Sequence, residues 1–100
     1  MKLNVVYLYK KSSPLNAFIE RQLRDASFLD SYTLEKYTIE DCPVAVNNLD
    51  INVWHTLIFY SPFGDELMRL EGPFSTEQFY EALFKAKKIY ADNSVVSFLL

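Results

Sequence analysis

The stretch WHTLIFYSPFGDELMRLEG, residues 54–72, decides the fold of this chain. Residues 55–60 are mostly apolar, β-branched or aromatic, as in a buried strand, and residues 66–72 alternate through Leu67, Met68 and Leu70 and end in Gly72. Between the two segments lie Pro62 and Gly64, which are typical of a tight turn. We therefore expect two antiparallel strands that are joined as a hairpin.

A helix is predicted directly after this hairpin. Ser75 precedes an apolar repeat, and Gln78 follows it by three residues, which is the spacing of a capping box. The apolar positions on one side of this helix are Phe79, Leu83, Ala86 and Tyr90. Asn93 interrupts the pattern, and we expect the helix to end there.

Four further elements are expected before the hairpin. Residues 3–9 are almost continuously apolar, which predicts a central strand. A helix is expected to begin at Ser13 and Pro14, with Ser13 as its N-cap. Residues 32–41 favour a second strand, and residues 43–50 favour a short helix. The side of the first helix that packs on the sheet is expected to carry Leu15, Phe18, Ile19, Leu23 and Ala26.

The predicted order of elements is β-α-β-α-β-β-α, which indicates an α/β fold in one domain of residues 1–100. The first two strands are each followed by a helix, so they are expected to pair in parallel, whereas the last two form the hairpin. The sheet is therefore predicted to be mixed and four-stranded. Half of the 100 residues are apolar, which is enough for a compact core.

Composition excludes several classes of function. The net charge is −3, and the basic residues are scattered except for Lys85, Lys87 and Lys88, which disfavours nucleic-acid binding. The first apolar run is broken at Asn4 and is too short for a signal sequence or a membrane span. Cys42 is the only cysteine, so neither an intrachain disulfide nor a zinc cluster is expected. We expect a cytoplasmic protein without a membrane partner.

Several segments resemble the thioredoxin family. KYTIEDCP, residues 36–43, is similar to the end of that family's second parallel strand, with an acidic pair shortly before a proline. Residues 64–72 match its Gly-x-Glu-x-x-Arg-x-x-Gly hairpin, and residues 75–83 resemble its terminal helix. The resemblance covers residues 3 to about 90. It implies a thioredoxin-like fold of glutaredoxin size.

The positions that carry the family's chemistry have all changed. By this resemblance, Ser13 stands at the attacking cysteine and Asn16 at the resolving cysteine. Tyr7 stands where thioredoxins bury an aspartate, and His55 stands at the cis-proline. Thiol–disulfide exchange needs one thiolate that attacks sulfur and a second thiol that resolves the mixed disulfide. The resemblance therefore implies a scaffold without dithiol chemistry.

Four residues are candidates for a binding surface, which we name the pseudo-active face: Ser13, Asn16, Trp54 and His55. The Ser13 hydroxyl either caps the helix or donates a hydrogen bond to a ligand thiolate. Trp54 either anchors a partner protein or fills the core. His55 lacks the partners of a catalytic triad, and a non-proline residue at its position favours a trans peptide bond. Cys42 follows two acids and is expected to be inert.

We therefore expect a redox-inactive thioredoxin-like protein that serves as a protein-binding or assembly module. No catalytic residue, metal or cofactor is expected. The alternative, from a different class, is a glutathione-binding protein or glutathione-dependent enzyme that uses Ser13 at the helix N-terminus.

The end of the chain carries apolar side chains that are unusual at a terminus. They are Val95, Val96, Phe98, Leu99 and Leu100. Such residues either dock on the domain or contact another subunit. We expect a separate short element after Asn93 that packs partly on a second copy, which would make a homodimer.

Overall fold

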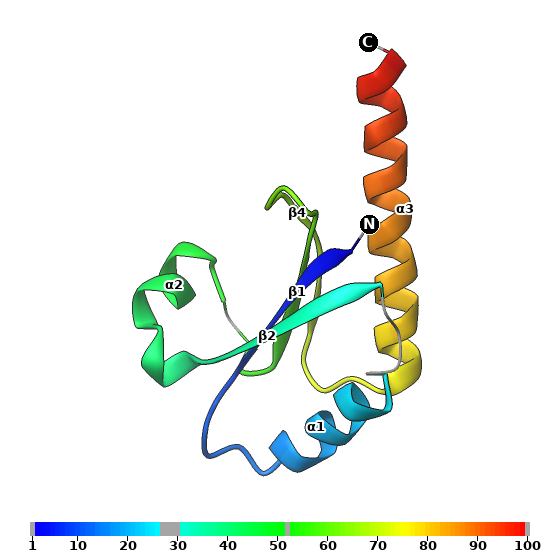
Figure 1. The fold of residues 1–100 in the computed structure, drawn as a ribbon. Helices are drawn as coiled ribbons and strands as arrows, with labels where there is room; N and C mark the ends of the chain where they lie inside the picture. Colours follow the sequence, from blue (N-terminus) through cyan, green and yellow to red (C-terminus); the bar gives the residue numbers. More distant parts are fainter. Residues whose placement is uncertain (1, 27–30, 52, 100) are drawn as a thin grey trace.

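The computed structural model describes residues 2–26, 31–51 and 53–99, with side chains for all of these except residue 45 and residues 93–99. Four strands form one sheet in the order β2-β1-β3-β4 (Figure 1). The strands are β1 (Leu3–Tyr9), β2 (Tyr32–Thr38), β3 (Thr56–Tyr60) and β4 (Glu66–Glu71).

The pairing of the strands confirms the predicted mixed sheet. β1 runs parallel to β2, with Leu3 opposite Tyr32. β1 and β3 are antiparallel, and so are β3 and β4, with a register shift between Phe59 and Tyr60. The almost continuously apolar β1 lies between two other strands, as a strand covered on both faces should.

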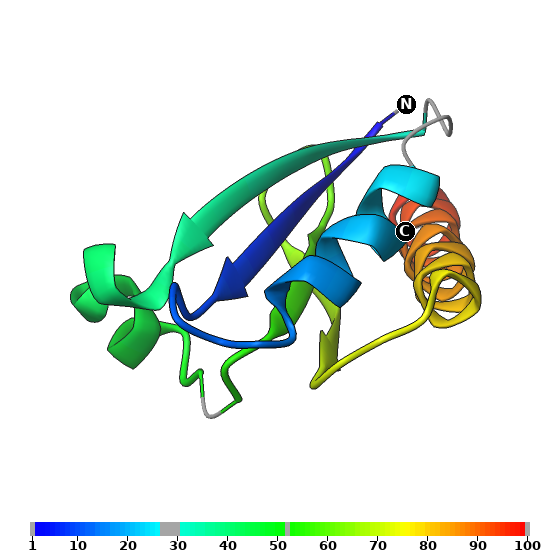
Figure 2. The same cartoon turned by 90° about the horizontal axis from the view of Figure 1, so that it is seen from below.

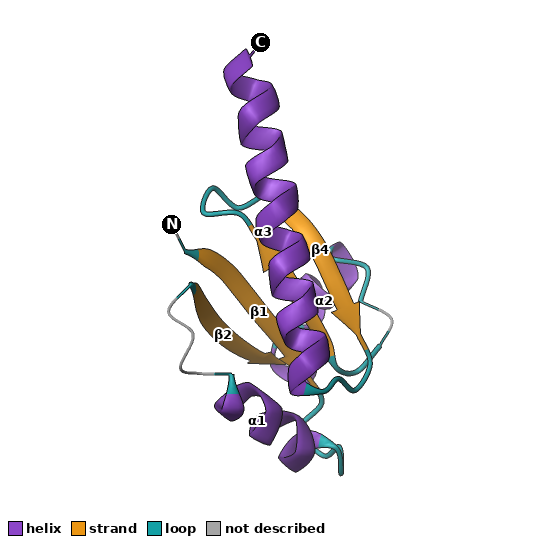
Figure 3. Ribbon diagram, turned by 90° about the vertical axis from the view of Figure 1, so that its right-hand side faces the viewer, coloured by secondary structure: helices purple, strands orange, loops and turns teal. Residues whose placement is uncertain are grey.

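The helices cover the two faces of the sheet unequally. α1 (Asn16–Asp25) and α3 (Thr76–Leu99) lie on one side, whereas α2 (Pro43–Asn48) lies on the other (Figure 2). Figure 3 shows the long α3 in front of the sheet and the short α2 behind it. We call these two sides the α1/α3 face and the α2 face.

The α1/α3 face carries the main core. Successive side chains of a strand point to opposite faces, so Val5 and Tyr7 of β1 point to this side together with Leu57 and Phe59 of β3. They pack against buried residues of the two helices and of the C-cap of α1: Ile19, Leu23, Ala26, Phe79, Ala82, Leu83 and Ala86. Phe79 lies at the centre of an aromatic group with Tyr32, Phe59 and Phe74.

The α2 face is covered less completely. Leu8 and Ile58 are buried there. Their neighbours Val6 and Tyr60 remain partly exposed. α2 has six residues, so it reaches over only part of this face.

The structure corrects the predicted start of the first helix. α1 begins at Asn16 rather than at Ser13 and Pro14, and Leu15 occupies its N-cap position without a side-chain cap. The Ser13 Oγ atom accepts a hydrogen bond from the Leu15 backbone N–H at 3.2 Å. Ser13 therefore closes a turn before the helix, and the expected bond to an N–H two residues on is present outside the helix.

The predicted packing face of α1 is also partly wrong. Ile19, Leu23 and Ala26 are buried as expected, but Leu15 and Phe18 are exposed. Leu15 lies before the first helical residue, and Phe18 is turned by about 100° around the helix axis from the buried Ile19.

The second strand is shorter than residues 32–41. It ends at Thr38, and Ile39–Asp41 form a 3₁₀ turn. The Thr38 hydroxyl donates a hydrogen bond to the Asp41 carboxylate across this turn. Hydrogen bonds from Thr38 and Lys11 hold the pKa of Asp41 below its ordinary value.

The terminal helix begins as predicted and ends later than predicted. The Ser75 N–H donates to Gln78 Oε1 at 2.9 Å, and the Gln78 N–H donates to Ser75 Oγ at 3.2 Å, which confirms the capping box. α3 then continues through Asn93 to Leu99, so the prediction that the helix ends at Asn93 and that a separate short element follows is wrong. Asparagine lowers helix propensity by only a few tenths of a kcal/mol, which neighbouring residues offset.

The last part of α3 projects past the sheet, as both Figure 1 and Figure 3 show. The apolar side chains of residues 95–100, on which the expected homodimer depends, lie outside the described side chains. The homodimer stays a prediction. Within the described residues, no helix is long and apolar enough to cross a membrane.

Candidate functional site

The four residues of the pseudo-active face lie around one end of the central strand. β1 ends at Tyr9, and the loop of residues 10–15 leads from it into α1. The antiparallel neighbour β3 begins at the same end, because Leu8 lies opposite Thr56. The segment with Trp54 and His55 is thereby brought to the loop and to the first residue of α1.

The side chain of Asn16 links the loop before α1 to His55 by hydrogen bonds. Its Nδ2 atom donates to the carbonyl oxygens of Lys10 at 2.8 Å and Lys11 at 3.1 Å. Its Oδ1 atom lies 3.0 Å from Nε2 of His55. Since Asn16 Oδ1 can only accept, His55 Nε2 carries the proton in this pair. Asn16, which the resemblance places at the resolving cysteine, thus uses its side-chain amide to bind the loop and His55.

His55 is buried, with 4% of its surface exposed. Its ring stacks on Tyr7 with a centroid distance of 6.4 Å and an interplanar angle of 18°. Burial lowers the pKa of His55, because a charged imidazole loses hydration there. The imidazole is therefore a neutral donor that fixes Asn16.

The peptide bond between Trp54 and His55 is trans, as the sequence predicted, and no cis peptide bond occurs within the described residues. The carbonyl oxygen of His55 accepts the Gly72 N–H at 2.8 Å, which ties this segment to the end of β4. The segment is thus fixed by a hydrogen bond on its backbone as well as by the His55 ring.

Trp54 points to the surface. It is 55% exposed, so the interpretation of this residue as core filling is wrong. The Nζ atom of Lys10 lies 5.1 Å from the centroid of the indole ring, within the range of a cation–π contact. The sequence did not single out Lys10, and it placed Leu15 on the packing side of the first helix, whereas Leu15 is exposed here.

The loop before α1 has a second attachment. Glu40 Oε2 accepts the Lys11 backbone N–H at 2.9 Å, and Lys11 Nζ lies 3.1 Å from Asp41 Oδ1. The ion pair is exposed, so it adds little stability. Together with Asn16, these bonds give the loop a defined shape.

Tyr7 stands where the resemblance places a buried acid. Its side chain is fully buried between Tyr9, His55 and Phe74, and its ring stacks on Tyr9 at 5.1 Å. Its hydroxyl has no hydrogen-bond partner among the residues that the structure describes. Burial raises the pKa of Tyr7 well above its ordinary value, so it stays protonated and carries no charge.

The described part of the site offers hydroxyl, amide, imidazole and indole groups, but no thiol. Cys42 is partly buried and lines a cavity on the α2 face, whereas Tyr7 and His55 lie on the α1/α3 face. No group of three or more His, Cys, Asp or Glu side chains within residues 2–26, 31–51 and 53–92 is placed to hold a metal ion.

Comparison with known proteins identifies the fold. No family model matches the chain, and no curated protein matches its sequence. Among solved structures, Trxlp from Edwardsiella tarda is 21% identical, with a TM-score of 0.72 over 82% of each chain. Thioredoxin-2 of the malaria parasite, a component of its protein secretion machinery, is 13% identical, with a TM-score of 0.75 over 84% of this chain and 82% of its own.

A mutant thioredoxin from Halobacterium salinarum is similar as well, with 9% identity and a TM-score of 0.73 over 81% of this chain and 71% of its own. These identities establish a shared fold. The chain has a thioredoxin-like fold, and its single cysteine rules out a CxxC motif.

Proposed function

We propose that the chain is a redox-inactive thioredoxin-like module that binds a protein partner through its pseudo-active face. The observation that carries the proposal is the use of Asn16, at the resolving-cysteine position, as a structural link between the loop and His55. Dithiol exchange needs two thiols at this place, and neither Ser13 nor Asn16 supplies one.

The exposed residues beside this link supply the binding surface. Leu15 of the loop and Trp54 of the segment before β3 present apolar area on backbone that hydrogen bonds hold in place, and Lys10 adds a positive charge over the indole ring. Tryptophan is enriched among the residues that contribute most of the binding energy at protein interfaces. A segment that is already ordered loses little entropy on binding. The proposal includes the cytoplasmic location expected from the sequence.

Two measurements test this function. In an insulin-reduction assay, the chain is expected to show no turnover above the reductant alone. Partner capture from the native cell, with the chain immobilised, is expected to fall at least about tenfold for Trp54→Ala. The matched control is Phe63→Ala, which removes an aromatic side chain that is 79% exposed from the β3–β4 turn. Thioredoxin-like turnover, or equal capture by Trp54→Ala and the parent chain, contradicts the proposal.

Glutathione binding is the second candidate. Ser13 is partly exposed, and its Oγ atom accepts the Leu15 N–H, so its hydroxyl proton is available to a thiolate. Against this function, Ser13 lies three residues before the first residue of α1 and gains less from the helix dipole. Calorimetry with glutathione at millimolar concentration separates the two candidates, because only the second predicts heat that Ser13→Ala removes.

A further inference from the structure

A cavity of about 290 Å³ lies on the α2 face of the sheet. Its apolar lining consists of Val6 and Leu8 of β1 and Leu49 from the turn after α2. The other lining residues are Glu35, Tyr37, Cys42 and Tyr60. The cavity exists because the six residues of α2 cover only part of the sheet, and its volume is near the lower end for small-molecule sites, about 300 Å³.

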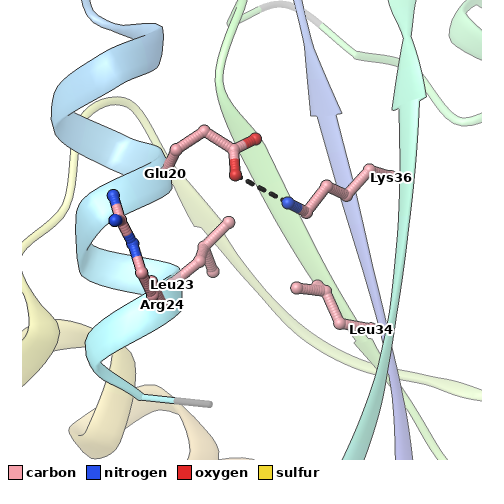
Figure 4. Close-up of a pocket in the computed structure, with 5 residues that line it drawn as sticks. All are labelled: Glu20, Leu23, Arg24, Leu34 and Lys36. Carbon is pink, nitrogen blue, oxygen red and sulfur yellow. Dashed lines mark hydrogen bonds and ion pairs between the residues drawn. The ribbon is translucent and has the colours of Figure 1, made fainter.

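The charges of this cavity differ from those of the cavity between α1 and β2. In that second cavity, Glu20 faces Lys36 with 2.6 Å between Oε2 and Nζ, and Arg24 lines the wall (Figure 4). Its carboxylate is therefore already neutralised by a cation of the chain. The cavity on the α2 face is lined by one carboxylate, that of Glu35, and by no Lys or Arg among the described residues.

The neighbours of Glu35 are suited to a cation. The Tyr37 hydroxyl donates to Glu35 Oε2, which orients the carboxylate and leaves its other oxygen to accept from a ligand. Tyr37 and Tyr60 add two aromatic rings to the same lining. Tyr37 is 42% exposed and Tyr60 is partly buried, and aromatic rings attract ammonium groups in both settings.

We propose that this cavity binds a small organic cation, an amine or quaternary ammonium with a compact apolar body. The apolar body contacts Val6, Leu8 and Leu49, and the ammonium group lies at Glu35 beside the tyrosine rings. An anion of the same size is rejected, because it would bring a second negative charge to Glu35. This binding is separate from the protein-binding surface proposed above, and its test does not depend on that surface.

The first experiment compares two probes of similar shape and opposite charge by calorimetry on the full chain. Benzyltrimethylammonium is expected to bind in a titration to roughly 10 mM, whereas phenylmethanesulfonate is expected to show no binding. Glu35→Gln is expected to weaken binding of the cation about tenfold. Glu20→Gln is the matched control, since it removes the same charge from the other cavity and is expected to leave the affinity unchanged.

The second experiment uses Cys42 to fill the cavity. It is the only cysteine and only partly buried, so N-ethylmaleimide in excess is expected to modify this one position, which mass spectrometry verifies before the titration, and the added group is expected to abolish binding of the cation. Cys42→Ser, treated in the same way, is expected to bind as the parent chain does. Four results overturn the proposal: no binding of the cation, equal binding of the sulfonate, equal weakening by Glu20→Gln and Glu35→Gln, or unchanged binding after modification of Cys42.

Discussion

The two faces of the sheet differ in how fully they are covered, although the same strands supply both. Adjacent valines of β1 illustrate this difference: Val5 on the α1/α3 face is 1% exposed, whereas Val6 on the α2 face remains partly exposed and lines a cavity. The cause is the length of the covering helices, because α1 and α3 have 10 and 24 residues and α2 has six. Complete cover stabilises the fold, and incomplete cover leaves room for a ligand.

The largest expected effect tests whether the α1/α3 face carries most of the stability. Phe79→Ala is expected to lower the free energy of unfolding by about 3–5 kcal/mol, because it removes a fully buried ring from the aromatic group of the core. Phe84→Ala, in the same helix, is expected to change it by less than about 0.5 kcal/mol, since that ring is 74% exposed. Urea unfolding of both variants measures the difference, and similar losses would contradict the placement of α3.

The two valines give a more direct comparison of the faces. Val5→Ala is expected to cost about 2 kcal/mol, because two methyl groups leave a closed core. Val6→Ala is expected to cost less than about 1 kcal/mol, because its side chain already borders open space. If Val6→Ala proves as costly as Val5→Ala, the α2 face is as tightly packed as the α1/α3 face.

Local sequence patterns predicted the covered face well. The hairpin of residues 54–72 and the capping box at Ser75 depend on neighbouring residues, and both are present in the structure. The parallel pairing of the first two strands followed from the crossover helix between them. The fold was therefore predictable from residues that lie close together in the chain.

The start of α1 was not predictable in the same way. Its first residue, Asn16, contacts His55, 39 residues further along the chain, and a local pattern does not show such a contact. The cavity on the α2 face likewise depends on where α2 stops and how it lies on the sheet. The pattern of residues 43–50 did not define that placement.

The pH dependence of stability tests the burial of His55. Its pKa is lowered in the folded protein, so the unfolded chain, with an ordinary value near 6.5, takes up the proton first as the pH falls. The contribution of neutral His55 to the free energy of unfolding is therefore complete above about pH 6.5. It is lost as the pH falls from there through the pKa of His55 in the folded protein. The slope of the free energy of unfolding against pH reaches at most about 1.4 kcal/mol per pH unit.

His55→Gln is the control for this effect, because glutamine keeps a hydrogen-bond donor but does not titrate in this range. Unfolding of both proteins is measured from about pH 7.5 to 5. The parent chain is expected to lose more stability than the variant over this interval. Equal losses would mean that the imidazole reaches water when it is protonated.

The smallest expected effect concerns two buried phenols on the α1/α3 face. The Tyr7 hydroxyl has no partner within the described residues, whereas the Tyr32 hydroxyl donates to the carbonyl oxygen of Ala26 at 3.0 Å. Tyr32→Phe is therefore expected to cost about 1 kcal/mol, since it leaves a buried carbonyl without this donor. Tyr7→Phe is expected to raise the free energy of unfolding by up to about 1 kcal/mol, because it removes a polar atom that gives up hydration on folding without a replacement. Opposite signs for the two variants in urea unfolding would support this packing of Tyr7 at the position where the resemblance places a buried acid. A loss of stability for Tyr7→Phe would show instead that its hydroxyl is hydrogen-bonded in the core.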